Sequence, residues 1–270
     1  MDSGLRDAVV LVTGASGGIG TAAARAFAAE GARVLLHGHT NTARLAELQA
    51  ELPHDPIALT ADLTDEAQVE RLFASAVSAC GRLDAVVANA GIWPPADEPI
   101  HKMSLKRWEE TLRTDLTSVF LCARAYFRYL DRVRPEHAAL VLVGSTAGIF
   151  GEAGHADYAA AKAGLSYGLL RTLKNEIVRL APQGRVNAVC PGWTLTNMAK
   201  PGLQDKDGIR RVLQTRPLSK LARPEDVAQA IVFLAAHRLS AHLTGVLLPV
   251  AGGMEGRVLH KFEDVDPHAI

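Results

Sequence analysis

The sequence predicts a single α/β domain with a doubly wound, seven-stranded parallel sheet that carries helices on both faces. Seven short apolar runs alternate with helix-forming segments along the chain, and a glycine-rich turn follows the first run. Regular alternation of strand and helix is typical of a parallel sheet. A length of 270 residues with 48% hydrophobic residues fits one domain with a substantial core.

The first predicted unit is strand, glycine turn and helix. An apolar run at 9–12 leads into Thr-Gly-Ala-Ser-Gly-Gly-Ile-Gly at 13–20, and an Ala-rich helix former follows at 22–30. Glycines let backbone amides approach a pyrophosphate, and a helix N-terminus favours its negative charge. We therefore expect this loop to bind nucleotide phosphates; a plain tight turn is the alternative.

The end of the second predicted strand, 33–37, bears on cofactor choice. A dinucleotide fold that prefers NAD places Asp or Glu there, on the ribose hydroxyls. This chain has Gly-His-Thr-Asn at 38–41, without an acid. The missing carboxylate favours NADP over NAD, with His39 able to contact a 2′-phosphate when protonated. Alternatively, His39 is an ordinary loop residue.

The remaining elements continue the alternation. Strands are predicted at 57–59, 84–87, 139–143, 186–190 and 246–248. Helices are predicted at 42–52, 64–79 with Thr64 as N-cap, 104–113, 115–132, 156 to about 180, 208–214 and 224–237. A polar, irregular stretch at about 193–220 predicts a substrate lid.

Tyr158 and Lys162 are four residues apart on a predicted helix and therefore share one face. An ammonium beside a phenol favours the phenolate and lowers the phenol pKa. With the Ser145 hydroxyl nearby, such a phenol can exchange a proton with an alcohol or a carbonyl oxygen. Tyr-x-x-x-Lys alone is more often an ordinary helix with a surface lysine, so the other motifs must decide.

Composition argues against several classes of protein. The formal net charge is zero and the pI is about 7.2, which does not suggest a nucleic-acid partner. The sequence has neither an apolar run long enough to span a membrane nor a signal peptide. Three widely spaced cysteines form no metal-type cluster and no disulfide framework. We expect a cytoplasmic protein without a metal site.

Taken together, the motifs resemble those of the short-chain dehydrogenase/reductase family over roughly residues 7–254. Each motif is weak alone, but their joint order is very specific. They are Thr13-Gly14-x-x-x-Gly18-Ile19-Gly20, Asp62, Asn89-Ala90-Gly91, Ser145 thirteen residues before Tyr158, Tyr158-x-x-x-Lys162, Pro191-Gly192 with Thr196, and Thr244-Gly245 before Gly252-Gly253.

The resemblance implies a Rossmann-type enzyme that interconverts a secondary alcohol and a ketone with NAD(P). Tyr158 would be the general acid or base, Lys162 would lower its pKa and bind the nicotinamide ribose, and Ser145 would hold the substrate oxygen. The implied cofactor residues are Gly14, Ser16, Gly18, Ile19 and Gly20 at the pyrophosphate and ribose, Asp62 and Leu63 at adenine, Asn89 and Gly91 on the adenosine side, and Pro191, Gly192 and Thr196 at the nicotinamide. Residues 1–254 would form the catalytic domain and 255–270 a C-terminal extension.

Asp115 departs from the family pattern, because most relatives carry Asn there to hold a water of a proton relay. A carboxylate near Lys162 would offset part of the lysine's effect on Tyr158 and raise the pH optimum for oxidation. A tolerated isosteric exchange is the alternative. The glycine loop also lacks a basic residue at Gly17, where NADP-preferring relatives often carry one.

The substrate pocket is expected, by position, to include Trp93, Phe150, His155 and Trp193. The aromatic residues suggest a flat or apolar substrate portion. His155, with Glu152, would meet polar groups unless both are exposed loop residues. A β-ketoacyl carrier-protein reductase, or a non-catalytic nucleotide-binding regulator on the same fold, are the alternative functions.

The resemblance also implies assembly into a homotetramer or homodimer through the helices at 115–132 and 156–180. We expect the C-terminal extension to reach a neighbouring subunit; a frayed terminus is the alternative.

Overall fold

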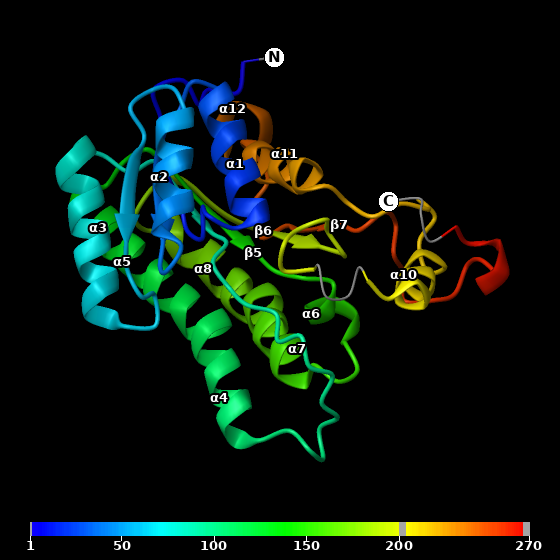
Figure 1. The fold of residues 1–270 in the computed structure, drawn as a ribbon. Coiled ribbons are helices and arrows are strands. Elements are labelled where there is room, and N and C mark those ends of the chain that lie inside the picture. Colours follow the sequence, from blue (N-terminus) through cyan, green and yellow to red (C-terminus); the bar gives the residue numbers. More distant parts are fainter. Residues whose placement is uncertain (1, 200–203, 267–270) are drawn as a thin grey trace.

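In the computed structural model, which describes residues 2–199 and 204–266, seven parallel strands form one sheet in the order β3-β2-β1-β4-β5-β6-β7 (Figure 1). This arrangement confirms the predicted fold class. The order reverses between β1 and β4, and in such sheets ligands bind at the carboxyl ends of the strands beside the reversal. The strands are β1 (Val9–Val12), β2 (Arg33–Gly38), β3 (Ile57–Thr60), β4 (Ala85–Ala88), β5 (His137–Val143), β6 (Gln183–Pro191) and β7 (Leu247–Val250).

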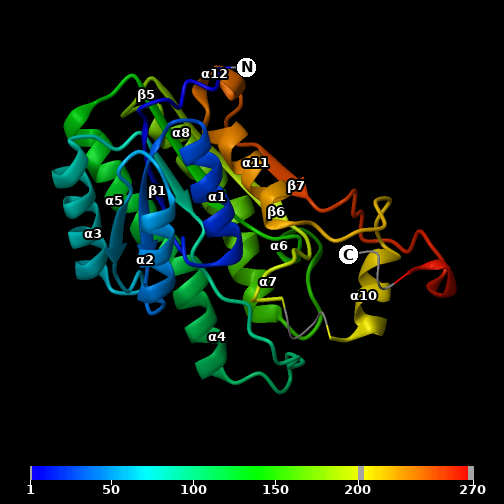
Figure 2. The ribbon, with the colours of Figure 1, turned by 45° about the horizontal axis from the view of Figure 1, so that its top comes forward.

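Helices cover both faces of this sheet, as Figures 1 and 2 show. Successive side chains of a strand point to opposite faces, so Val10 and Val12 join one core and Val9 and Leu11 the other. The first core is shared with α1 (Gly18–Ala29), α2 (Thr42–Glu51) and α11 (Pro224–Ala235), which α12 (His237–Ser240) follows. The second is shared with α3 (Glu66–Cys80), α5 (Ser118–Val133) and α8 (Leu170–Ile177).

The helix predicted at 156–180 is interrupted by a π-helical turn, and a second π-helical turn joins the two helices predicted at 104–113 and 115–132. η1 (Arg113–Thr117) joins α4 (Leu105–Leu112) to α5, and η2 (Gly164–Leu169) joins α7 (Ala156–Ala163) to α8. The two turns meet, because a Cβ at Gly164 would lie 3.2 Å from Leu116. Such turns are rare and often occur at functional sites; here one contains Asp115 and the other follows Lys162.

Thr64 is not the N-cap of α3, and that prediction was wrong. Helix α3 begins at Glu66, and the Asp65 side chain accepts a hydrogen bond from the Gln68 backbone N–H. Thr64 instead donates its hydroxyl to Asp62 at 2.8 Å. The Asp65 carboxylate therefore caps the helix, although the hydroxyl of the preceding Thr64 is also a suitable cap.

The C-terminal segment packs on this chain's own lid. Val265 is buried in a cluster with Ile209 and Leu213 of α10 (Lys206–Leu213), and with Leu221. The short 3-10 turn η3 (Phe262–Asp264) lies in the same segment, and Figure 2 shows the segment beside α10 at one end of the molecule. Contact of the extension with a neighbouring subunit stays a prediction. Residues 200–203 of the lid and 267–270 of the extension lie outside the described part of the chain.

Within residues 2–199 and 204–266, no helix is both long and apolar enough to cross a membrane.

Candidate active site

The glycine loop between β1 and α1 is closed so tightly that it needs glycines. Gly14 has φ +66°, a backbone conformation that glycine adopts without strain. A Cβ at Gly20 would lie 2.1 Å from the Gly14 carbonyl oxygen, and one at Gly18 would meet Thr196 at 2.7 Å. The turn into α1 therefore leaves no room for a side chain at Gly18 or Gly20, and Thr196 lies against the loop. Such a cradle fits a pyrophosphate at a helix N-terminus.

His37 holds this loop in place, a role that the sequence analysis missed. Its Nδ1 accepts a hydrogen bond from the Gly14 backbone N–H at 3.2 Å, and its Nε2 lies 3.0 Å from the Ala61 carbonyl oxygen. Burial lowers the pKa of His37 to about 4, so the ring is neutral near pH 7 with its proton on Nε2. The available signal was a single histidine near the end of an otherwise apolar strand.

Thr13 and Asn89 tie together the two loops that flank the reversal of strand order. The Thr13 hydroxyl donates to the Val87 carbonyl and accepts from the backbone N–H groups of Asn89 and Ala90. The Asn89 amide in turn donates to the Thr13 carbonyl at 2.9 Å. Asn89 is thus engaged in holding the glycine loop, and any contact with the adenosine side of a cofactor stays a prediction.

Two residues from different strands meet at the predicted adenine side. His39 follows β2 and is exposed, whereas Asp62 follows β3. The pKa of Asp62 lies below its usual value, chiefly because the Thr64 backbone N–H donates to it, and a charge on His39 lowers it further. Leu63, next to Asp62, is buried.

Ser145, Tyr158, Lys162 and Asp115 come together at the carboxyl ends of β4 and β5. Lys162 Nζ lies 3.6 Å from Asp115 Oδ2 and donates to the Val143 carbonyl at 3.3 Å. The same Nζ lies 5.5 Å from the centroid of the Tyr158 ring. The Ser145 hydroxyl accepts from the Ala147 backbone N–H and lies close enough to the Tyr158 phenol to lower the pKa of that phenol.

The pKa of the Tyr158 phenol lies above its usual value, although Lys162 lowers it as expected. Burial is the main cause of the rise, the Lys162 ammonium lowers the pKa, and the Asp115 carboxylate raises it again. Lys162 itself is only 4% exposed. Burial would lower its pKa, but Asp115 and Tyr158 hold the pKa above the usual range, so Lys162 stays charged.

Asp115 is fully buried, and its two oxygens differ. Oδ1 accepts the Ile92 backbone N–H at 2.8 Å, whereas Oδ2 has no hydrogen-bond partner among the described residues. Burial raises the pKa of Asp115, and the Lys162 charge opposes that rise. Gly91 lies over this pair, because a Cβ there would approach Asp115 Oδ1 at 3.1 Å and Lys162 Nζ at 3.2 Å. The loop after β4 therefore borders both the glycine loop and the charged pair.

The residues predicted for the substrate pocket divide into two groups. Trp93 donates its Nε1–H to Glu152 at 3.0 Å, stacks on the His155 ring at 4.8 Å, and thereby fixes the proline-rich loop. His155 is buried with Nε2 2.8 Å from the Pro94 carbonyl oxygen, so its reading as an exposed loop residue was wrong. Phe150 remains exposed, and Trp193 packs against the lid cluster that contains Ile209 and Leu213.

Pro191 ends β6 next to Ser145, and Gly192 follows it. The Pro191 carbonyl accepts from the Thr146 backbone N–H at 2.9 Å, and the Gly192 N–H donates to Val250 of β7 at 3.0 Å. This contact brings Pro191-Gly192 beside the polar cluster. In the described part of the chain, no group of three or more His, Cys, Asp or Glu residues is arranged to hold a metal ion.

Comparison with known proteins agrees with this geometry. A family model described as "Enoyl-(Acyl carrier protein) reductase" matches residues 14–255. The chain is 36% identical to a cis-4-hydroxycyclohexanecarboxylate dehydrogenase of Sinomonas cyclohexanicum, over 94% of this chain and 98% of that protein. It is also 35% identical to a 3-oxoacyl-[acyl-carrier-protein] reductase of a Synechocystis strain, over 91% of this chain and 96% of that protein.

Another relative and a solved structure extend the comparison. An L-rhamnose 1-dehydrogenase (NAD(P)(+)) of Azotobacter vinelandii is 36% identical, over 93% of this chain and 97% of that protein. Among solved structures, a putative gluconate dehydrogenase from Agrobacterium tumefaciens superimposes with a TM-score of 0.86 at 30% identity, covering 94% of this chain and 98% of that one.

Proposed function

This chain belongs to the short-chain dehydrogenase/reductase family of NAD(P)-dependent oxidoreductases that act on alcohols and ketones, and we propose that Tyr158, Lys162 and Ser145 carry out its proton transfer. One observation supports this assignment: the three residues lie close to Asp115 and beside Gly91. The loop that carries Gly91 also borders the glycine loop. Bound nicotinamide cofactor supplies the chemistry of hydride transfer.

In this proposal the side chains act on the substrate oxygen. In reduction, the Tyr158 phenol donates its proton to the carbonyl oxygen while the Ser145 hydroxyl holds that oxygen in position. In oxidation, Tyr158 accepts the alcohol proton. Lys162 opposes the rise in the Tyr158 pKa that burial causes, and it lies where it can bind a ribose hydroxyl.

NADP is the preferred cofactor in this proposal. The end of β2 carries no carboxylate to accept ribose hydroxyls or to repel a 2′-phosphate, and Asn41 there is engaged as the N-cap of α2. His39 is exposed at that edge and free to face a phosphate.

The favoured substrate is a small ketone or secondary alcohol. Two of the matched proteins are named for carboxylic acids, so 4-oxocyclohexanecarboxylate belongs in the substrate panel. A β-ketoacyl carrier-protein reductase remains the second candidate, because several relatives carry that name at 34–36% identity. The Trp93–Glu152 bond pins the proline-rich loop, which favours the smaller substrate.

Replacing Tyr158 with Phe tests the catalytic assignment. Removal of one hydroxyl should lower kcat by roughly 10²–10⁴-fold, as loss of a general acid does, with the NADPH dissociation constant unchanged within error by fluorescence titration. Tyr167→Phe is the matched control, because Tyr167 is an exposed tyrosine on η2. Equal turnover by Tyr158→Phe and wild type would contradict the assignment, and cofactor binding without turnover by wild type would favour the regulatory alternative.

Replacing Asp115 with Asn tests the effect of the buried carboxylate on pH dependence. Asp115 raises the Tyr158 pKa, so its neutral isostere should lower that pKa. Oxidation needs the deprotonated phenol, and its rate should therefore reach half-maximum at a pH lower by roughly 0.5–1 unit. The measurement is the pH–rate profile for alcohol oxidation. An unchanged profile would mean that the exchange is merely tolerated.

Replacing His39 with Asp tests cofactor choice. The new carboxylate should accept the ribose hydroxyls of NADH and repel a 2′-phosphate, shifting the ratio of NADH to NADPH dissociation constants toward NADH by roughly 100-fold. His54→Asp, in the exposed turn before β3, is the control. Tighter binding of NADH than NADPH by wild type would overturn the NADP proposal directly.

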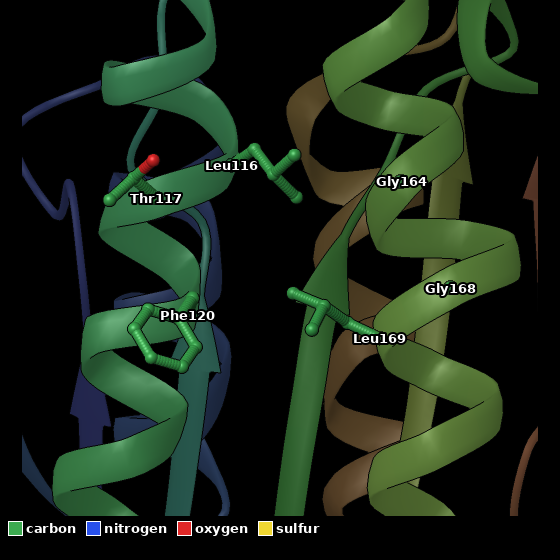
Figure 3. Close-up of a pocket in the computed structure, with 6 residues that line it drawn as sticks. All are labelled: Leu116, Thr117, Phe120, Gly164, Gly168 and Leu169. Atoms are coloured by element: carbon green, nitrogen blue, oxygen red, sulfur yellow. The ribbon is translucent and has the colours of Figure 1, made fainter.

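We also propose that the protein is a homotetramer or homodimer and that it resides in the cytoplasm, where its three free thiols stay reduced. An apolar groove lies between two neighbouring helical segments: Leu116 and Thr117 of η1 with Phe120 of α5 form one wall, and Gly164, Gly168 and Leu169 of η2 form the other (Figure 3). Phe120 is 43% exposed there. An apolar groove on two adjacent helices fits the matching face of a second copy.

Phe120→Glu should break that assembly, because it buries an unpaired charge at the interface. Light scattering should report the monomer mass for this variant and a dimer or tetramer for wild type. Leu105→Glu, on the exposed start of α4, is the control and should keep the wild-type mass. A monomeric wild-type protein would rule out the proposed interface.

A further inference from the structure

A buried guanidinium with two unpartnered nitrogens, among the residues that the structure describes, lies between the carboxyl ends of β6 and β7. Arg216 is only 1% exposed, and its Nε and Nη2 make no hydrogen bond with any residue that the structure describes. Burial lowers its pKa to about 10, so the group is still charged near pH 7. A buried charge without a counter-ion is strongly unfavourable. Arg216 therefore calls for an anion from outside the described chain.

The two unpartnered nitrogens lie on one edge of the guanidinium, and that edge matches a carboxylate. Nε and Nη2 present two parallel N–H groups, the arrangement that binds both carboxylate oxygens at once. The same protein shows this contact elsewhere, since Arg25 donates from Nε and Nη2 to the two oxygens of Glu51 at 2.6 and 2.8 Å. The same edge of Arg216 has no hydrogen-bond partner among the described residues.

The position of Arg216 connects it to the active site. A Cβ at Gly192 would lie 2.9 Å from Arg216 Nη2, so the guanidinium lies against the glycine that directly follows β6. The residue before it, Pro191, accepts a hydrogen bond from the backbone of Thr146, next to Ser145. The guanidinium therefore lies against Gly192, and the preceding residue, Pro191, is hydrogen-bonded to the neighbour of the proposed catalytic serine.

The lid and the C-terminal segment enclose this position. His260 Nε2 lies 3.0 Å from the Arg216 carbonyl oxygen, and the backbone N–H of Leu259 donates to Gln214 at 2.7 Å. Val265 and Leu213 belong to the apolar cluster that joins the segment to α10.

We propose that Arg216 binds the carboxylate of the substrate, so that the enzyme acts on a hydroxy or oxo acid. This inference rests on the proposed oxidoreductase function and adds the substrate class to it. The carbonyl or alcohol end would lie at Tyr158 and Ser145, and the acid end would lie toward the lid. A carboxylate from a second copy of the chain has the same chemistry and is distinguished by the test.

The test compares an acid with its neutral ester. Wild type should reduce 4-oxocyclohexanecarboxylate with a kcat/KM roughly 100-fold above that of its methyl ester, since the ester leaves the buried charge unpaired. Arg216→Gln should abolish this preference, mainly through a higher KM for the acid. Arg211→Gln is the matched control: Arg211 lies on the same helix α10, is largely exposed and pairs with Asp205, and its loss should leave the preference intact.

Three results would overturn the assignment. The first is equal use of acid and ester by wild type. The second is a loss in Arg216→Gln that is the same for both substrates. The third is a change of oligomer mass in Arg216→Gln without a change in preference, which would assign the anion to a second copy.

A binding measurement covers the cases in which the variant does not fold or neither compound is turned over. With NADP present, cyclohexanecarboxylate should raise the Tm of wild type, whereas the neutral cyclohexanecarboxamide should not. Stabilisation by the acid without turnover of any ketone would contradict the proposed function while supporting the anion site. Equal effects of acid and amide would contradict the anion site alone.

Discussion

The buried ion pair between Lys162 and Asp115 is the contact on which the site depends. Lys162 comes from α7, Asp115 from the π-turn η1, and the Val143 carbonyl that accepts from Lys162 ends β5. The Ile92 backbone N–H then ties the loop after β4 to the same carboxylate. Because a buried ammonium needs a counter-charge, these four elements must be positioned together, and the face of α7 that carries Tyr158 is positioned with them.

Much of the fold could be predicted from the sequence, because its signals are local. Apolar runs such as Val9–Val12 and the glycine loop after it depend on neighbouring residues alone. The proximity of Ser145, Tyr158 and Lys162 was also expected. Helical spacing places Tyr158 and Lys162 on one face of a helix, and the family resemblance adds Ser145. Exact element ends were less predictable: Asp65 rather than Thr64 caps α3, because two adjacent residues can both serve as caps.

The features that sequence could not supply depend on contacts between distant segments. The His37 ring accepts a hydrogen bond from Gly14 in the glycine loop and contacts the carbonyl oxygen of Ala61 after β3, and both residues are distant in sequence. The direction of the Tyr158 pKa depends on how deeply the phenol is buried, and spacing to Lys162 says nothing about burial. The C-terminal segment packs on α10 through scattered apolar residues without any motif.

Three buried cations show how the chain distinguishes structural from functional charge. Arg185 satisfies its guanidinium with the carbonyls of Leu234 and Ala235 and with the Ser240 hydroxyl, so it fastens α11 and α12 to β6. Lys162 has a resident carboxylate, because Asp115 Oδ2 lies 3.6 Å from its Nζ. Among the residues that the structure describes, Arg216 has neither carbonyl nor carboxylate at the edge formed by Nε and Nη2. Because the fold keeps this buried charge without such a partner in its described part, we propose a partner that arrives and leaves, as a substrate does.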